Sequence, residues 1–138
     1  RVQTCALPIL TAELTVLALA GLLQGIQFAA FSVAANMQVG PRVAMGPRDD
    51  APQLKGTAGR LQRAFGNHFE GLILFTLAVV AVTLGGQASA VTGACAWIYL
   101  AARILYVPAY VLGWVPWRSA IWAVGFGATM TMILAALV

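Results

Sequence analysis

The chain has 138 residues, of which 61% are hydrophobic and only 9% are charged, and its formal net charge is +4. Its mean hydropathy is +0.87. Because soluble domains carry about 25% charged residues, this composition excludes an ordinary soluble protein and predicts an integral membrane protein. It also argues against nucleic-acid binding, because several cations lie in or beside apolar runs and form no basic patch with interleaved aromatic residues.

The first ten residues, RVQTCALPIL, do not fit a membrane span. The run is interrupted by Pro8, and it is too short for the apolar region of a signal peptide followed by a cleavage site. We therefore expect residues 1–10 to be a non-native or disordered leader. A single transmembrane domain is expected over residues 11–138.

Four apolar stretches are long enough, as helices, to cross a hydrocarbon core of about 30 Å. The predicted spans are residues 14–38, 58–84, 91–113 and 118–138. Thr11 can cap the first helix, and Gly40-Pro41 ends it. The sequence thus predicts an all-α, four-helix membrane bundle.

The loop over residues 40–57 holds the main basic cluster, with Arg60 and Arg63 just beyond it. Cytoplasmic loops are enriched in Lys and Arg. We therefore place the 40–57 loop in the cytoplasm and both termini outside. Arg118, at the start of the fourth span, falls on the cytoplasmic side as well.

The first predicted span has a polar face that carries Gln24, Gln27, Phe31 and Gln38. Buried amides of this kind form hydrogen bonds between membrane helices. The face either holds two helices together or forms the wall of a polar site.

The second predicted helix carries a polar stripe made of Arg60, Arg63, Asn67 and Glu70. At about 100° per residue, their spacing places them within an arc of about 80°. Polar groups at membrane depth are costly, so they need partners or a ligand. His68 lies off this arc, and we interpret it as a polar helix residue and not as a catalytic base.

Arg103 lies inside the third predicted span, where an arginine costs at least about 2.5–3.5 kcal/mol. Glu70 is the carboxylate expected at the same depth, so we expect the two to pair. The pair either locks two helices together or belongs to a binding site. The excess of arginines on this half of the membrane suits an anionic ligand. Tyr106 and Tyr110 share a helix face with Arg103 and add hydroxyl groups.

Other chemistry is poorly supported by the sequence. One histidine and no CxxC motif exclude a metal site of familiar spacing. Asp49 and Asp50 lie in the loop, so no Ser–His–Asp set can be proposed. Cys95 lies in an apolar run, and we expect it to be a small packing residue.

Two motifs resemble the MAPEG family, the membrane-associated proteins in eicosanoid and glutathione metabolism. The first is Arg60-x-x-Arg63-Ala64-x-x-Asn67-x-x-Glu70, followed by Leu72 and Phe75. The second is Arg103-x-x-Tyr106-x-x-x-Tyr110, followed by Gly113, Arg118-Ser119 and Trp122. The resemblance covers residues 11–138, and both motifs lie on the expected helices.

The resemblance implies a four-helix protomer that forms a homotrimer, with glutathione bound between adjacent protomers. Arg118 matches an arginine that is thought to stabilise the glutathione thiolate, which is the catalytic role. The positions matched to the glutathione site are Arg63, Asn67, Glu70, Arg103, Tyr106, Tyr110 and Ser119, with Arg63 and Arg103 of more structural character. Gly66 stands where glutathione-dependent members carry an arginine, and Trp122 stands where several carry a tyrosine.

The function that the resemblance implies is a glutathione-dependent transferase or peroxidase in a bacterial inner membrane. Its partners are the lipid bilayer, glutathione as a co-substrate and a lipophilic electrophile as the second substrate. The alternative is a non-enzymatic membrane protein of the same fold, with a degenerate site that binds a lipid or a small anion.

Overall fold

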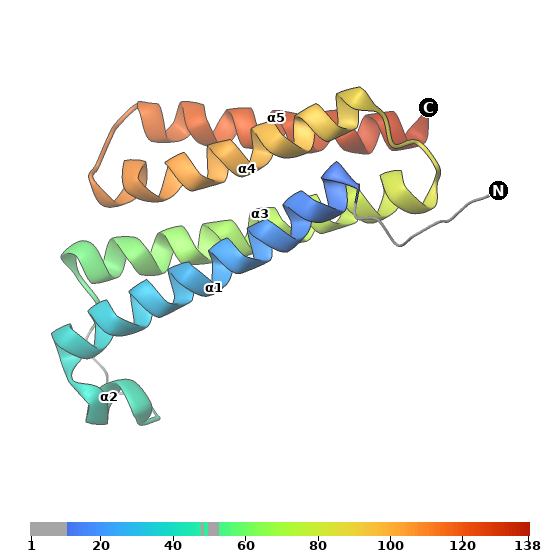
Figure 1. Ribbon diagram of the computed structural model, residues 1–138. Coiled ribbons are helices and arrows are strands. Elements are labelled where there is room, and N and C mark those ends of the chain that lie inside the picture. Colours follow the sequence, from blue (N-terminus) through green and yellow to red (C-terminus); the bar gives the residue numbers. More distant parts are fainter. Residues whose placement is uncertain (1–10, 48, 50–52) are drawn as a thin grey trace.

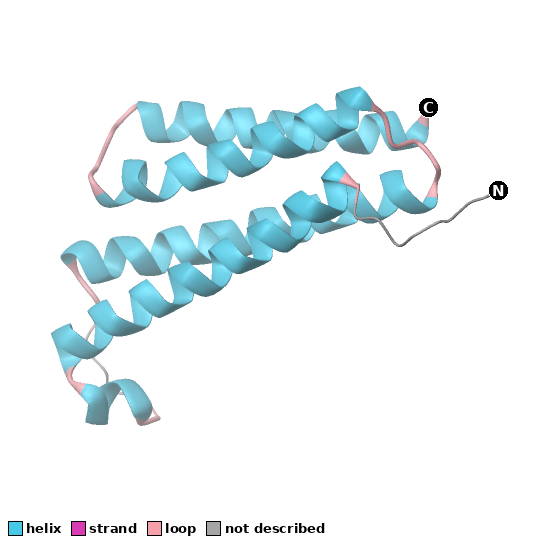
Figure 2. Cartoon of the chain, viewed as in Figure 1, coloured by secondary structure: helices cyan, strands magenta, loops and turns pink. Residues whose placement is uncertain are grey.

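The computed structural model describes residues 11–47, 49 and 53–138, so the leader expected over residues 1–10 lies outside the described residues. All regular elements in the described part are helices (Figure 2). They are α1 (Ala12–Val39), α2 (Pro41–Met45), α3 (Gly56–Leu84), α4 (Ala90–Val111) and α5 (Trp117–Leu137). The prediction of an all-α chain with four long apolar helices is confirmed. The short helix α2 corrects the expectation that residues 40–57 form only a loop.

The four long helices form two antiparallel pairs (Figure 1). Helix α1 packs mainly against α3, and α4 packs mainly against α5. Helix α3 also contacts both helices of the second pair. Helix α2 projects from one end of the bundle, beside the end of α1. The start of α3, the end of α4 and the start of α5 consequently lie at one end of the molecule.

Each of the four long helices is long and apolar enough to cross a membrane. Large apolar side chains are exposed on all of them, including Leu22, Ile73, Ile98 and Leu134. In water such a surface would drive association, whereas in a bilayer it faces acyl chains. The protein is therefore an integral membrane protein.

Local sequence signals explain where the helices begin and end. Thr11 caps α1 as predicted, because its hydroxyl accepts a hydrogen bond from the Leu14 amide at 3.2 Å. Gly40 ends α1 with a φ of 87°, a conformation that favours glycine. Pro41 then begins α2, where its missing amide hydrogen costs nothing. Ser89 and Thr92 form a capping box at the start of α4.

The apolar core lies in the half of the bundle away from α2. All four long helices contribute to it, with Val16, Ala20, Phe75, Ala78, Val79, Val82, Ala96, Tyr99, Leu100, Ala128 and Met132. The many alanines allow close approach of the helix backbones. Phe75 stacks on Tyr99 with ring centroids 4.0 Å apart and an interplanar angle of 2°. Cys95 is partly buried and packs against this core, which agrees with its expected packing role.

The Phe75–Tyr99 stack predicts the effect of a core truncation. Phe75→Ala should destabilise the protein by about 3–5 kcal/mol, because it removes a fully buried ring and leaves a cavity. The thermal unfolding midpoint of the detergent-purified protein measures this loss. Phe69→Ala is the matched control on the same helix, because Phe69 is 55% exposed. Equal midpoints for the two variants would contradict the assignment of this core.

Candidate functional site

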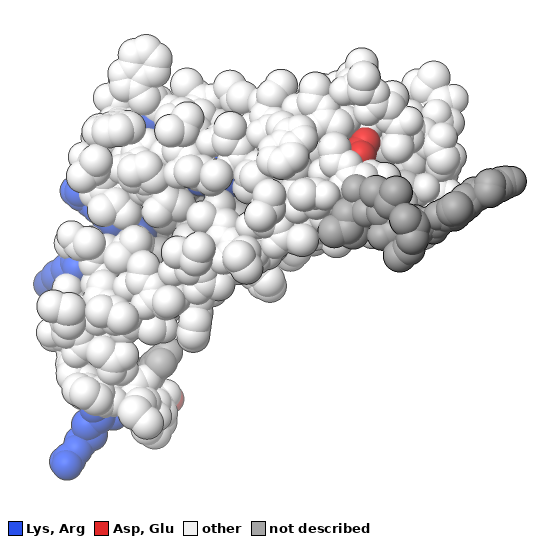
Figure 3. Space-filling model, viewed as in Figure 1, with Lys and Arg blue, Asp and Glu red and all other residues white. Residues whose placement is uncertain are grey.

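A cavity of about 560 Å³ lies at the end of the bundle where α3 begins, α4 ends and α5 begins. We call it the outer cavity. Its volume is in the range of small-molecule sites. Lys and Arg side chains gather at this end of the molecule (Figure 3). The residues that line the outer cavity are Arg63, Gly66, Asn67, Glu70, Tyr106, Tyr110, Arg118, Ser119 and Trp122.

The outer cavity brings together nearly all of the site residues that the sequence suggested. Every one of them lines it except Arg103, which lines a smaller cavity behind it. Gly66 and Trp122, the two departures from the family pattern, line the outer cavity as well. Three of the four residues of the predicted stripe on α3, Arg63, Asn67 and Glu70, therefore share this surface, whereas Arg60 does not.

Tyr110 holds the two cations of the outer cavity. Its hydroxyl oxygen accepts a hydrogen bond from Nε of Arg63 at 3.0 Å. The guanidinium carbon of Arg118 lies 4.8 Å from the centroid of the same ring, within cation–π range. The Tyr106 ring packs edge-on against Tyr110, with 5.7 Å between centroids. Because the Tyr110 oxygen accepts from Arg63, its own proton remains able to donate to a ligand.

The expected salt bridge between Glu70 and Arg103 is not formed. Both residues line the smaller cavity, yet among the described residues neither makes a salt bridge. The guanidinium carbon of Arg103 instead lies 4.6 Å from the centroid of the Tyr106 ring, on its own helix. Glu70 is exposed and also lines the outer cavity, so its carboxylate is available there.

Arg60 does not supply the cation that is missing at Gly66. Its Nη1 donates to the backbone oxygen of Val111 at 2.8 Å, and Arg60 does not line the outer cavity. It therefore satisfies a carbonyl at the end of α4. At Gly66 a Cβ would meet nothing within 4 Å, so the position has open space beside it.

Two amides on the polar face of α1, Gln24 and Gln38, join α1 to α3 or its start, whereas the buried Gln27 amide has no partner among the described residues, and no residue of the face lines the outer cavity. Gln24 Oε1 lies 2.5 Å from Nδ1 of His68, whose ring is fully buried between α1 and α3. The Gln38 side chain bonds to both backbone groups of Lys55, which joins the end of α1 to the start of α3. This face of α1 therefore does not form a wall of the outer cavity. Sequence reasoning did not pair Gln24 with His68, because helix spacing alone does not give the register between two helices.

Residues 12–138 match the family model for the MAPEG family. This range contains all four long helices and every residue of the outer cavity. No curated protein and no solved structure matches the chain.

Proposed function

Because the chain belongs to the MAPEG family, we propose that it is a membrane-bound glutathione-dependent transferase or peroxidase that acts on lipophilic electrophiles. Glutathione is the co-substrate and binds in the outer cavity. The observation that carries this proposal is the convergence of Arg63, Arg118, Glu70 and Tyr110 on that one cavity. Helix α2 lies at the same end of the bundle, within the basic segment 40–57, so the proposal places this end on the cytoplasmic side of a bacterial inner membrane.

The charges of the outer cavity complement those of glutathione. The peptide carries two carboxylates, one ammonium group and one thiol. Arg63 and Arg118 are suited to carboxylate or thiolate, because guanidinium groups form charge-assisted hydrogen bonds with anions. Glu70 is suited to the ammonium group. Asn67 and Ser119 add neutral hydrogen-bonding groups beside them.

We assign the catalytic role, stabilisation of the glutathione thiolate, to Arg118. Its side chain is half-buried and packs on the Tyr110 ring, so the guanidinium has a fixed place in the cavity. A cation beside the sulfur favours the thiolate over the thiol, and the thiolate is the nucleophile. The thiol proton leaves to water, the sulfur electron pair forms a carbon–sulfur bond, and the leaving group departs with its bonding pair.

An apolar wall suits the lipophilic second substrate. Trp122 lines the outer cavity and stacks on Phe126, with centroids 5.1 Å apart and an interplanar angle of 10°. Both side chains are partly exposed on α5, on a surface that faces acyl chains in a bilayer. A substrate dissolved in the membrane can therefore reach the cavity over this wall.

The exposed side of the outer cavity supports a homotrimer. Glu70, Ser119 and Trp122 line the cavity, yet all three are exposed in the protomer. A neighbouring protomer packed over α3 and α5 would close that side and exclude water from the thiolate. In the proposal, glutathione therefore lies between adjacent protomers.

The alternative function is a non-enzymatic membrane protein whose outer cavity binds a lipid or a small anion. The observations in its favour are the open space at Gly66 and the engagement of Arg60 with Val111. Together they leave the cavity with one cation fewer than the sequence pattern of the glutathione-dependent family members. This alternative requires binding without thiol chemistry.

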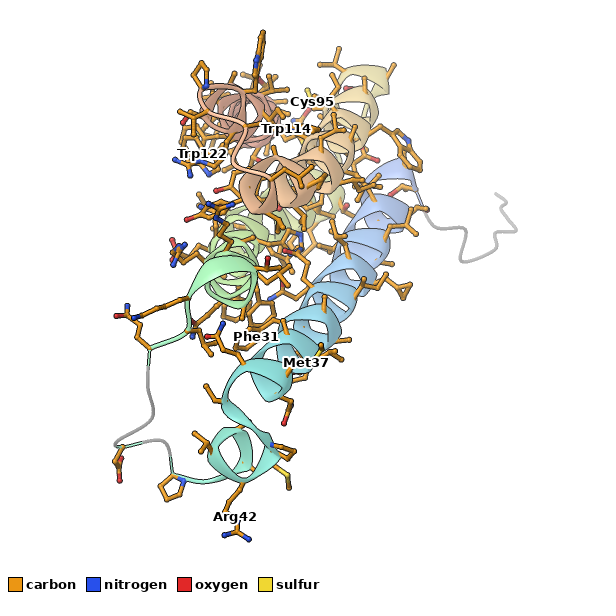
Figure 4. The ribbon with its side chains drawn as sticks, turned by 90° about the vertical axis from the view of Figure 1, so that its left-hand side faces the viewer. Phe31, Met37, Arg42, Cys95, Trp114 and Trp122 are labelled. Carbon is orange, nitrogen blue, oxygen red and sulfur yellow. The ribbon has the colours of Figure 1, made fainter. Side chains whose placement is uncertain are left out.

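Substitution of Arg118 separates the two functions. The detergent-purified wild-type protein should release or absorb heat when titrated with glutathione. Arg118→Ala should lower kcat/KM for thiol conjugation by about 10²-fold or more, as expected when a group that stabilises a developing anion is lost. Arg42→Ala is the matched control, because Arg42 projects from α2 away from the bundle (Figure 4).

Two results would go against the enzyme. The first is the absence of binding heat at millimolar glutathione in a folded oligomer. The second is loss of the oligomer itself in Arg118→Ala, which would assign Arg118 a structural role and favour the alternative.

Gly66→Arg should strengthen glutathione binding. A side chain at this position enters open space beside the cavity, so it adds a cation without a clash. One additional charge-assisted hydrogen bond of about 1 kcal/mol corresponds to about fivefold in affinity. Calorimetric dissociation constants measure the change. Gly66→Ala controls for the altered helix propensity, and equal affinities in the two variants would show that the added charge does not face the ligand.

A further inference from the structure

Behind the outer cavity lies a second cavity of about 130 Å³, which we call the inner cavity. It is lined by residues of α3, α4 and α5, and it shares Asn67, Glu70 and Trp122 with the outer cavity. The residues found only in the inner cavity include Tyr99, Arg103 and Gly71. The function proposed above makes no use of this space.

Arg103 brings an uncompensated charge to the inner cavity. Its side chain is only 3% exposed, and its Nε and Nη2 atoms are buried without a hydrogen-bond partner in the described part of the chain. The guanidinium carbon lies 4.6 Å from the centroid of the Tyr106 ring, within cation–π range. A cation–π contact does not supply a hydrogen-bond acceptor, so the Nε and Nη2 donors remain unpaired.

A second buried donor lies beside this guanidinium. Tyr99 is 2% exposed, and its hydroxyl has no hydrogen-bond partner among the described residues. The stack with Phe75 fixes the Tyr99 ring, so the hydroxyl cannot turn away to another site. Buried polar groups almost always have partners, so two unpartnered donors at one cavity indicate a ligand or water.

Gly71 leaves space beside the Tyr99 hydroxyl and the guanidinium of Arg103. A Cβ at Gly71 would lie 3.6 Å from the Tyr99 hydroxyl oxygen and 3.8 Å from Nη1 of Arg103. A group of about that size, lying against α3 at this glycine, is therefore in reach of the Tyr99 hydroxyl and of Nη1 of Arg103, the guanidinium nitrogen beside the unpartnered Nε and Nη2. Because Gly71 has no side chain, this space is part of the cavity.

The positive charge of Arg103 indicates that the ligand of the inner cavity is an anion. Glu70 is the carboxylate that lines the inner cavity, and it forms no salt bridge with Arg103. A guanidinium at membrane depth is costly without a counter-charge. We propose that the inner cavity binds a small monovalent anion such as chloride, held by Arg103 and Tyr99 beside Gly71. Binding of the anion does not require glutathione in the outer cavity, although the two cavities share Glu70.

The test uses the full chain in detergent, with chloride titrated against bulky gluconate at constant ionic strength. A ligand that binds the folded state raises the unfolding midpoint in a saturable way. We expect a rise of a few degrees in the wild type. Gly71→Ala should abolish that rise, because its methyl group fills the space of the anion at ordinary contact distances and leaves both donors in position.

Gly127→Ala is the matched control. It makes the same change on a long helix, at a position where a Cβ meets nothing within 4 Å and which lines neither cavity. It should keep the full chloride-dependent rise. Tyr99→Phe retains the ring that stacks on Phe75 and loses only the hydroxyl, so it should raise the half-saturating chloride concentration by about fivefold.

Three results would overturn the proposal. One is a wild-type midpoint that is equal in chloride and gluconate, as expected if Glu70 turned inward to neutralise Arg103. Another is a chloride-dependent rise in Gly71→Ala as large as that of the wild type. The third is an unchanged half-saturating concentration in Tyr99→Phe.

Discussion

A guanidinium buried among apolar helices is the constraint on which this structure depends. Arg103 needs space and a surface that accepts its charge, and its neighbours on three helices provide both. Tyr106 offers its ring face one turn further along α4. Gly71 on α3 leaves room beside the guanidinium, and a Cβ at Gly125 on α5 would already touch Ala102 and the Arg103 side chain at 3.4 and 3.9 Å. A methyl group at either glycine would lie in van der Waals contact with the Arg103 side chain.

The division of the bundle into an apolar half and a polar half follows from this placement. On α3 and α4 the sequence changes from core residues to polar residues at about the same depth, between Phe75 and Gly71 and between Tyr99 and Arg103. The apolar half fixes the distances between the helices by close packing of small side chains. In the other half some polar side chains, such as Arg63 and Tyr110, both join two helices and face a cavity.

Much of this arrangement could be predicted from the sequence, because helix periodicity shows which residues share a face. The stripe from Arg63 to Glu70 does line one cavity, and the four apolar spans are helices. The partner of Arg103 was not predictable in the same way. Periodicity placed Glu70 at a suitable depth but carried no information on the competing Tyr106 ring. The sequence did not single out Gly71 either, because the space that a glycine leaves becomes part of a cavity only when the helices are packed together.

The two cavities meet at Glu70, and this contact links the two proposals. Glu70 lines both cavities, so its carboxylate faces cations on two sides, with Arg63 and Arg118 in the outer cavity and Arg103 in the inner one. An anion held by Arg103 removes the attraction that would draw this carboxylate inward. The carboxylate then stays available to a cationic group of a ligand in the outer cavity. Because coupling between sites is reciprocal, a ligand that holds Glu70 outward should in turn favour the anion at Arg103.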